Sequence, residues 1–273
     1  MTTYEKLPPN KKAEFVKHKY DNLNGKQKYA TSRDWNLREL EINFILSNLE
    51  SLQKGSQILD IGCGNGYTDV RIAQKLPVHV DGIDFSGKVI EGANHLKSKC
   101  KHMVGSVDFW VGDITGLHLK ESSFDAVVSE RGLLNLPDRE TQFNVIREVY
   151  RVLKEGGIYI MVEGTRDGLR RLNELRTLVG LKPIPDRDED NIQSLKFVEY
   201  ELEEVLRYLP FYTVKKQYFG MYYFISRVIH PLLMAPEEPK FDAKINEVAR
   251  KIALVEPDYK RIGHIVGYVL QKL

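Results

Sequence analysis

The chain has 273 residues, 42% of them hydrophobic and 29% charged, which is typical of a globular protein of one or two domains. The formal net charge of +2 gives no sign of a broad nucleic-acid footprint, and the two cysteines, Cys63 and Cys100, provide neither a disulfide framework nor metal-ligand spacing. Residues 1–10 lack the apolar segment of a signal peptide, and no run of about 18 apolar residues predicts a membrane span. We therefore expect a cytoplasmic protein with no membrane insertion and no nucleic-acid partner.

The N-terminal region is charged up to about Lys28, and a helix is predicted to begin near Arg33. The apolar residues that recur at helical spacing and should face the core are Leu37, Leu40, Phe44 and Leu49. We expect residues 1–35 to form a cap segment that precedes a single domain of residues 36–273.

The apolar run at 57–61 is the most informative segment, because it contains Asp60 and then breaks into a glycine-rich loop. The glycines stand at alternate positions, Gly62, Gly64 and Gly66, and a helix-compatible segment follows. This pattern predicts a buried strand, a tight loop and a helix N-terminus, whose unpaired N–H groups suit an anionic ligand. The spacing G-x-G-x-G differs from the dinucleotide fingerprint G-x-G-x-x-G. This argues against a nicotinamide-dependent oxidoreductase and for a smaller nucleoside ligand.

Three further apolar runs each lead to a carboxylate. They are 78–85 with Asp84, 107–111 with Asp113, and 124–130 with Glu130. A carboxylate at the tip of the second strand can accept hydrogen bonds from both hydroxyls of a ribose. Strand-then-acid units separated by helical patterns predict an open α/β sheet, whose ligands bind at the carboxyl ends of the strands.

The order of these motifs resembles that of the class I S-adenosylmethionine (SAM)-dependent methyltransferases. The matching segments are ILDIGCGNGYT (58–68), GIDFS (82–86), VGDIT (111–115), FDAVVSERGLLNLPD (124–138) and REVYRVLKEGGIYIMVE (147–163). The resemblance covers about 36–165. It implies a Rossmann-like, seven-stranded α/β sheet, parallel with an antiparallel edge strand, and helices on both faces. It also implies SAM as the cofactor and S-adenosylhomocysteine as the product.

The resemblance assigns cofactor-binding roles by position. The residues expected to hold the methionine part of SAM are Asp60, Gly62, Cys63, Gly64, Asn65 and Gly66. Asp84 is expected to bind the ribose, and Phe85 to flank the adenine. Asp113, with Ile114 beside it, is expected at the adenine amino group, while a helix N-cap is the competing role for Asp113.

In similar enzymes an N-terminal segment closes over SAM. Arg38 is therefore expected to pair with the methionine carboxylate, because a guanidinium forks onto a carboxylate. Trp35 and Asn36 stand beside it in the sequence. They either meet the ligand or belong to a surface helix that Trp35 anchors by packing.

By the same resemblance, Glu130 and Arg131 are expected to line both the methionine end of the SAM site, where Glu130 binds the cofactor, and the mouth of the acceptor site. Glu130 and Glu163 end adjacent predicted strands, so they are the candidate general bases for an oxygen acceptor. His230 is a third candidate, although a helix cap or surface position suits it better. The arginines that either attract an anionic acceptor or form a solvated helix face are Arg166, Arg170 and Arg171.

The connections beyond the fifth predicted strand exceed what the fold needs, with cap insertions at about 165–200 and 226–262. An aromatic run at 218–224 lies between them. We predict that these segments form a helical and aromatic cap over the active site, while packing of the aromatics against the sheet edge is the competing explanation. Parts of this region are similar to uncharacterised bacterial and archaeal methyltransferases that often accompany glycan-assembly enzymes, an association that is compatible with a sugar acceptor but fixes no substrate.

Together these features predict methyl transfer to a small-molecule or sugar acceptor, with oxygen favoured over nitrogen. The segment 129–132 carries neither the tetrad nor the cysteine with which DNA-base methyltransferases act. No metal site is expected, because Glu130 and Asp138 alone do not make an acid cluster. The alternative function is a SAM-binding sensor or assembly subunit that transfers nothing, and the sequence leaves a homodimer open.

Overall fold

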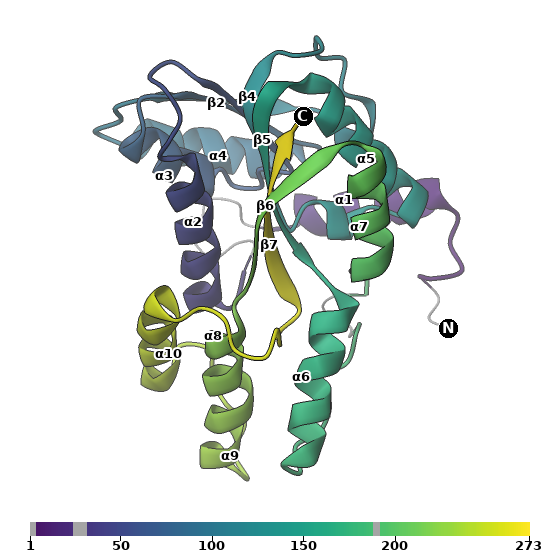
Figure 1. Cartoon of the computed structure of the whole chain (residues 1–273), viewed down its shortest axis with the longest axis vertical. Helices are drawn as coiled ribbons and strands as arrows, with labels where there is room; N and C mark the ends of the chain where they lie inside the picture. The colour runs from purple at the N-terminus through teal and green to yellow at the C-terminus, as the bar shows by residue number, and fades with distance from the viewer. Residues whose placement is uncertain (1–3, 24–31, 188–191) are drawn as a thin grey trace.

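The computed structural model describes residues 4–23, 32–187 and 192–273, which form a seven-stranded sheet with helices on both faces (Figure 1). The strands are β1 (Gln57–Ile61), β2 (His79–Asp84), β3 (Ser106–Val111), β4 (Phe124–Glu130), β5 (Leu153–Gly164), β6 (Phe211–Tyr218) and β7 (Ile265–Lys272). Their order in the sheet is β3-β2-β1-β4-β5-β7-β6, and β7 runs antiparallel to both of its neighbours. The predicted Rossmann-like sheet is therefore confirmed, with β7 and β6 forming the antiparallel pair at its edge.

The helices connect the strands and cover both faces of the sheet. They are α1 (Pro9–Asp21), α2 (Trp35–Leu49), α3 (Tyr67–Lys75), α4 (Gly87–Lys99), α5 (Arg139–Val152), α6 (Arg166–Leu178), α7 (Glu199–Tyr208), α8 (Gly220–Phe224), α9 (His230–Met234) and α10 (Lys244–Val255). Shorter turns are η1 (Ile114–Gly116), η2 (Leu133–Asn135) and the π-helical turn η3 (Ile225–Ile229).

Both faces of the sheet are buried, because successive strand residues point to opposite sides. On one face, Ile58 and Val128 belong to a core that includes residues of α2, α3, α4 and α10. On the other face, Leu59 and Val127 pack with residues of α5 and α7. Burial on both sides explains why these strands read in the sequence as continuous apolar runs rather than as alternating patterns.

Two local features differ from the sequence-based expectation. The pattern does not predict α1, because Val16 is the one buried residue of this helix and no apolar stripe marks it. The glycine pair at 156–157, expected as a turn between a helix and a strand, lies within β5. Gly156 there adopts a φ of +72°, and the pairing of β5 with β4 shifts its register.

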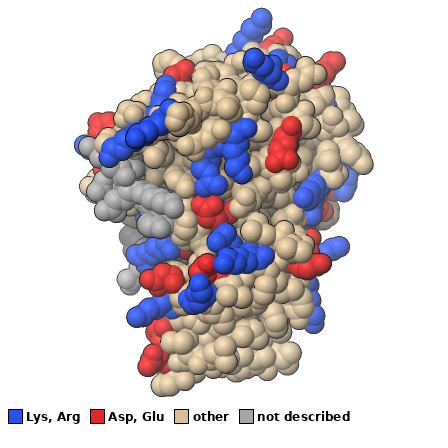
Figure 2. All heavy atoms as spheres, turned by 90° about the vertical axis from the view of Figure 1, so that its left-hand side faces the viewer, with Lys and Arg blue, Asp and Glu red and all other residues tan. Residues whose placement is uncertain are grey.

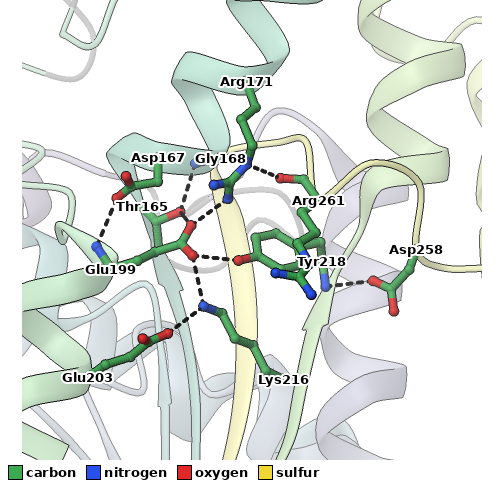
Figure 3. Close-up of polar contacts among 10 residues, drawn as sticks. All are labelled: Thr165, Asp167, Gly168, Arg171, Glu199, Glu203, Lys216, Tyr218, Asp258 and Arg261. Atoms are coloured by element: carbon green, nitrogen blue, oxygen red, sulfur yellow. Dashed lines mark hydrogen bonds and ion pairs between the residues drawn. The ribbon is translucent and has the colours of Figure 1, made fainter.

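The segments that follow β5 extend beyond the edge at which the parallel strands end (Figure 1). A polar network centred on Glu199 fixes the start of α6 to α7 and β6 (Figure 3). The Glu199 carboxylate accepts hydrogen bonds from Arg171 at 2.7 Å, from Lys216 at 2.8 Å and from the Tyr218 hydroxyl at 2.5 Å. Asp167 in turn accepts the Glu199 backbone N–H at 2.8 Å. This network gives α6 a fixed position at the acceptor side of the sheet.

The surface carries charges of both signs. On the face seen in Figure 2, lysine and arginine side chains alternate with acidic ones rather than forming one basic stripe. Within the described ranges, no helix combines the length and the apolar character that a membrane crossing demands.

The packing of α2 on β7 generates a stability prediction. A Cβ added at Gly267 would lie 2.5 Å from Cε1 of Phe44, so we expect Gly267→Ala to destabilise the fold by about 1–3 kcal/mol through overpacking. Gly87→Ala is the matched control, because a Cβ at that helical position meets no atom within 4 Å. Urea unfolding of both variants measures the difference, and equal stabilities would contradict this account of the α2–β7 contact.

Candidate functional site

The loop between β1 and α3 has the backbone geometry that its glycines predict. Gly62, Gly64 and Gly66 all have positive φ values, of 78°, 56° and 68°. Gly66 is also sterically restricted, because a Cβ there would lie 2.4 Å from Cζ of Phe109. The N–H groups of Gly62 and Cys63 both donate to the carbonyl oxygen of Ile83, which fixes the loop against the end of β2.

Asp84, at the end of β2, is held by the loop that it faces. Its Oδ2 accepts the Gly64 N–H at 3.0 Å, and its Oδ1 accepts the Ser86 N–H at 2.9 Å. Burial is the largest influence on this carboxyl, and it raises the pKa of Asp84 to about 6 against the effect of the backbone hydrogen bonds. Each oxygen keeps a second lone pair, so the carboxylate can still accept hydrogen bonds from a ligand.

Asp60 and Asp113 occupy the neighbouring strand ends. Asp60 is 2% exposed, and its Oδ1 has no hydrogen-bond partner among the described residues. Burial and the nearby Asp69 carboxylate raise the pKa of Asp60. Asp113 caps the turn η1, because its Oδ1 accepts hydrogen bonds from the N–H and the hydroxyl of Thr115, both at 2.8 Å. The capping role considered for Asp113 is therefore present in the structure.

A cavity of about 880 Å³ runs along this edge of the sheet. The sequence-predicted residues that line it are Arg38, Asp60, Gly62, Cys63, Gly64, Asp84, Phe85, Asp113, Ile114 and Glu130. Asn65 and Gly66, also predicted, lie outside the lining. The volume is near the upper end of the roughly 300–1,000 Å³ typical of small-molecule sites, so it offers room for more than a nucleoside.

Helix α1 supplies one wall of this cavity, which the sequence reasoning missed. Ala13, Val16 and Tyr20 line it from this helix. The Tyr20 ring meets Phe85 edge-on with centroids 6.1 Å apart, and Asp21 accepts a hydrogen bond from the Ser86 hydroxyl at 2.6 Å. This helix falls within residues 1–35, for which the sequence predicts a cap segment, and residues 24–31 of that segment lie outside the described ranges.

Glu130 and Arg38 form a buried ion pair where the cavity passes β4. Their N–O distance is 3.0 Å, and Glu130 Oε2 accepts the Thr68 hydroxyl at 2.6 Å. The neighbouring residue, Arg131, adopts a φ of +56° and contacts the buried Glu41 at 3.1 Å. Both oxygens of Glu130 are thus engaged within the protein, a geometry that does not favour Glu130 as a general base.

Glu163 lies outside the cavity lining, contrary to the expectation that it faces the acceptor. It is fully buried, and its two oxygens accept the backbone N–H groups of Leu133 and Leu134 at 2.9 and 3.2 Å. Glu163 therefore holds the turn η2 after β4, because it satisfies donors that would otherwise be unpaired. Its position corrects the catalytic role predicted from adjacent strand ends.

The aromatic run at 218–224 packs in the core rather than over the cavity, which it does not line. Tyr222 and Tyr223 are fully buried, and the Tyr222 hydroxyl donates to Asp34 at 2.6 Å. His230, buried in α9, is also absent from the lining. The cap insertions do reach the cavity, but through Leu169 and other residues outside the run.

The three arginines considered as anion attractors are engaged in ion pairs. Arg166 pairs with Asp186 at 3.2 Å, and Arg170 pairs with Glu174 at 2.7 Å. Arg171 pairs with Glu199, as described above. In the part of the chain that the structure covers, no three His, Cys, Asp or Glu side chains group in a way that could hold a metal ion.

The comparisons with known proteins agree with this fold. Residues 58–157 match the family model of a methyltransferase domain. A solved SAM-dependent methyltransferase from Methanosarcina mazei matches with a TM-score of 0.56 and 24% identity, over 84% of this chain and 97% of that one. Residues 58–157 therefore match a methyltransferase domain, and the chain has the fold of a class I SAM-dependent methyltransferase. This confirms the resemblance seen in the sequence motifs, with SAM as the cofactor of the family.

Two curated relatives have names that state a substrate. The 27-O-demethylrifamycin SV methyltransferase of Amycolatopsis mediterranei is 38% identical over 112 residues, which are 41% of this chain and 40% of that protein. The demethylmenaquinone methyltransferase of Listeria welshimeri is 30% identical over 160 residues, 58% and 62% of the two chains. The matches thus span less than two thirds of either relative.

The geometry of Asp84 generates a pH prediction. We expect the ionised carboxylate to accept the ribose hydroxyls of SAM, so affinity should fall about tenfold per pH unit below about 6, where Asp84 gains a proton. Asp84→Asn should weaken binding by roughly 1.5–3 kcal/mol at pH 8 and remove this pH dependence. Asp108→Asn, outside the cavity lining, is the matched control. Calorimetric titration with S-adenosylhomocysteine between pH 5 and 8 tests this, and an unchanged profile in Asp84→Asn would refute the ribose assignment.

Proposed function

We propose that this protein transfers the methyl group of SAM to an oxygen atom of a small organic acceptor. The observation that carries the proposal is the shape of the cavity, which begins at Asp84 and Asp113 and continues past Glu130 to Gly164 and His264. One end offers the carboxylates that suit a nucleoside, and the other end lies at the end of β5 and the start of β7.

The residues of the first half suit SAM. Asp84 offers acceptors for the ribose hydroxyls, and Gly64 leaves the backbone accessible at the loop. The buried Oδ1 of Asp60, for which the described residues provide no hydrogen-bond partner, suits the ammonium group of the methionine part. When bound, SAM supplies a methyl group on a sulfonium, which carries its own leaving group.

Arg38 is expected from the sequence to pair with the methionine carboxylate by itself, and we propose that it does so together with Glu130. Its Nη1 pairs with Glu130 and its Nη2 donates to the Thr68 hydroxyl at 3.2 Å, yet the side chain lines the cavity. We propose that Arg38 and Glu130 orient the methionine end as one unit, in which the guanidinium faces the ligand carboxylate. Glu130 then positions Arg38 rather than removing a proton.

The names of the curated relatives support a small-molecule acceptor. One acts on 27-O-demethylrifamycin SV and the other on demethylmenaquinone, as their names state. A sugar acceptor, implied by the sequence resemblance, is the alternative within the same class. Leu169, Ile184 and Phe241 line the cavity together with polar groups, which suits a ligand with both apolar and polar parts.

A labelled-methyl transfer assay tests the proposal. Purified protein and SAM labelled in the methyl group are incubated with small-molecule fractions, nucleotide sugars and glycan fragments of the host. We expect a labelled product and stoichiometric S-adenosylhomocysteine with at least one fraction.

The matched variant is Gly64→Val. A β-branched side chain is strained at the φ of 56° and would stand in the ligand path, so SAM binding and transfer should both be lost. Binding of SAM by the wild type without transfer to any fraction would instead favour a sensor or assembly subunit.

A further inference from the structure

The acceptor half of the cavity lies at one place on the sheet edge. Because β5 and β7 follow β4 in the strand order, the edge leads from Glu130 at β4 to Gly164 at β5 and then to His264, directly before β7. Neighbouring strands lie about 5 Å apart, so His264 stands about two strand spacings beyond the methyl-donor end. Gly164 leaves space here, since a Cβ on it would contact Lys196 Cγ at 3.1 Å.

Three cations surround this space and line the cavity: Arg131, Lys196 and Arg227. Each has a carboxylate partner. Arg227 pairs with Asp34, Arg131 with Glu41, and Lys196 with Asp186.

The pairing leaves an excess of positive charge. Asp186 is shared between Lys196 and Arg166, each at 3.2 Å, so one carboxylate serves two cations. Burial also raises the pKa of Glu41, which lessens its neutralisation of Arg131. Four cations, Arg131, Arg166, Lys196 and Arg227, thus share three carboxylates, Asp34, Glu41 and Asp186, and the balance among these groups is positive.

His264 lies among these positive charges. Its ring packs edge-on against Tyr223 with centroids 5.2 Å apart, and its buried Nδ1 has no hydrogen-bond partner among the described residues. Burial, and then the charges of Lys196, Arg227 and Arg131, hold the pKa of His264 well below its ordinary value. A neutral imidazole offers one N–H donor to a ligand. The positive charges that oppose a proton on His264 would stabilise an oxyanion beside it, whereas burial, which raises the pKa of the neighbouring Tyr223 hydroxyl, acts against ionisation.

Neither glutamate expected as a base is available for that hydroxyl. Glu130 is engaged by Arg38 and Thr68, and Glu163 accepts two backbone N–H groups outside the cavity. A protonated imidazole at His264 would be opposed by the three cations around it. Asp34 and Asp186, the other carboxylates of this part of the lining, are held by Arg227 and by Lys196 and Arg166. We therefore expect the acceptor oxygen to arrive without its proton.

We propose that the acceptor is an acidic hydroxyl compound, a phenol, enol or hydroxyquinone, which binds as its oxyanion beside His264 and faces Lys196 and Arg227. This inference rests on the proposed methyltransferase function. The acceptor oxyanion forms the new O–C bond while the C–S bond breaks and its electron pair stays on sulfur. The acceptor proton leaves to solvent before the complex forms, so no protein base takes part. His264 donates its N–H to the oxyanion and is a positioning residue for the acceptor.

The test uses chromogenic probes whose ionised forms absorb visible light: 4-nitrophenol and 2-nitrophenol. Each is titrated into protein saturated with S-adenosylhomocysteine, at a pH one unit below the pKa of the free probe, where about one tenth is ionised. We expect the bound probe to be at least half ionised, a shift of about tenfold in its proton affinity. The neutral analogue nitrobenzene should bind at least tenfold more weakly.

Variants separate the contributions of the groups. Lys196→Gln should return the ionisation of the bound probe toward its free value by about tenfold. His264→Ala should weaken anion binding about tenfold, and His264→Asn, which keeps an N–H donor, should recover part of it. Lys251→Gln, an exposed position on α10 outside the cavity lining, should change nothing. Unchanged S-adenosylhomocysteine affinity in each variant shows that it has folded.

The outcomes separate this inference from the proposed function. If the probes bind in their ionised form but no host fraction is methylated, the oxyanion site is supported and the proposed function is contradicted. Methyl transfer to host fractions, combined with probes that bind as neutral molecules or not at all at millimolar concentration, overturns the oxyanion site alone. Equal behaviour of Lys196→Gln and Lys251→Gln would overturn it as well.

Discussion

Two buried contacts between α2 and the end of β4 hold the cavity together. Arg38 meets Glu130 at 3.0 Å, and Glu41, three residues further along the same helix, meets Arg131 at 3.1 Å. Removing charges from water is costly, and the loss of one partner leaves the other buried and uncompensated. At its start α2 carries Asp34, which pairs with Arg227 on the acceptor side. The position of this one helix therefore sets both halves of the cavity.

The sheet and the cofactor half could be predicted from the sequence, because their determinants are local. A strand buried on both faces reads as an apolar run, and the end of each run marks the edge where ligands bind. Asp60, Asp84 and Asp113 stand at such ends, and the structure brings all three to one cavity. The alternate glycines also predict the loop directly, since a positive φ is costly for other residues.

The acceptor half could not be predicted in this way, because it depends on contacts distant in the sequence. Glu130 and Glu163 look alike as acids at strand ends, yet only the folded chain shows that one meets Arg38 and the other meets backbone N–H groups of η2. The aromatic run was similarly misleading, since dense aromatics suit a core as well as a pocket. His264 follows a glycine and precedes a strand, a context with no signal of its own. Only the strand order and the direction of β7 bring His264 to the cavity.

The reversed direction of β7 has a consequence for the order in which the protein becomes complete during synthesis. An antiparallel strand contributes its first residue, rather than its last, to the edge at which the other strands end, and so His264 reaches the cavity. The cofactor-side residues from Arg38 to Glu130 leave the ribosome more than a hundred residues before it. β7 must then insert between β5 and β6, which are already made. A nascent chain can therefore contain all the residues of the nucleoside-binding half before it contains His264, which lines the acceptor half.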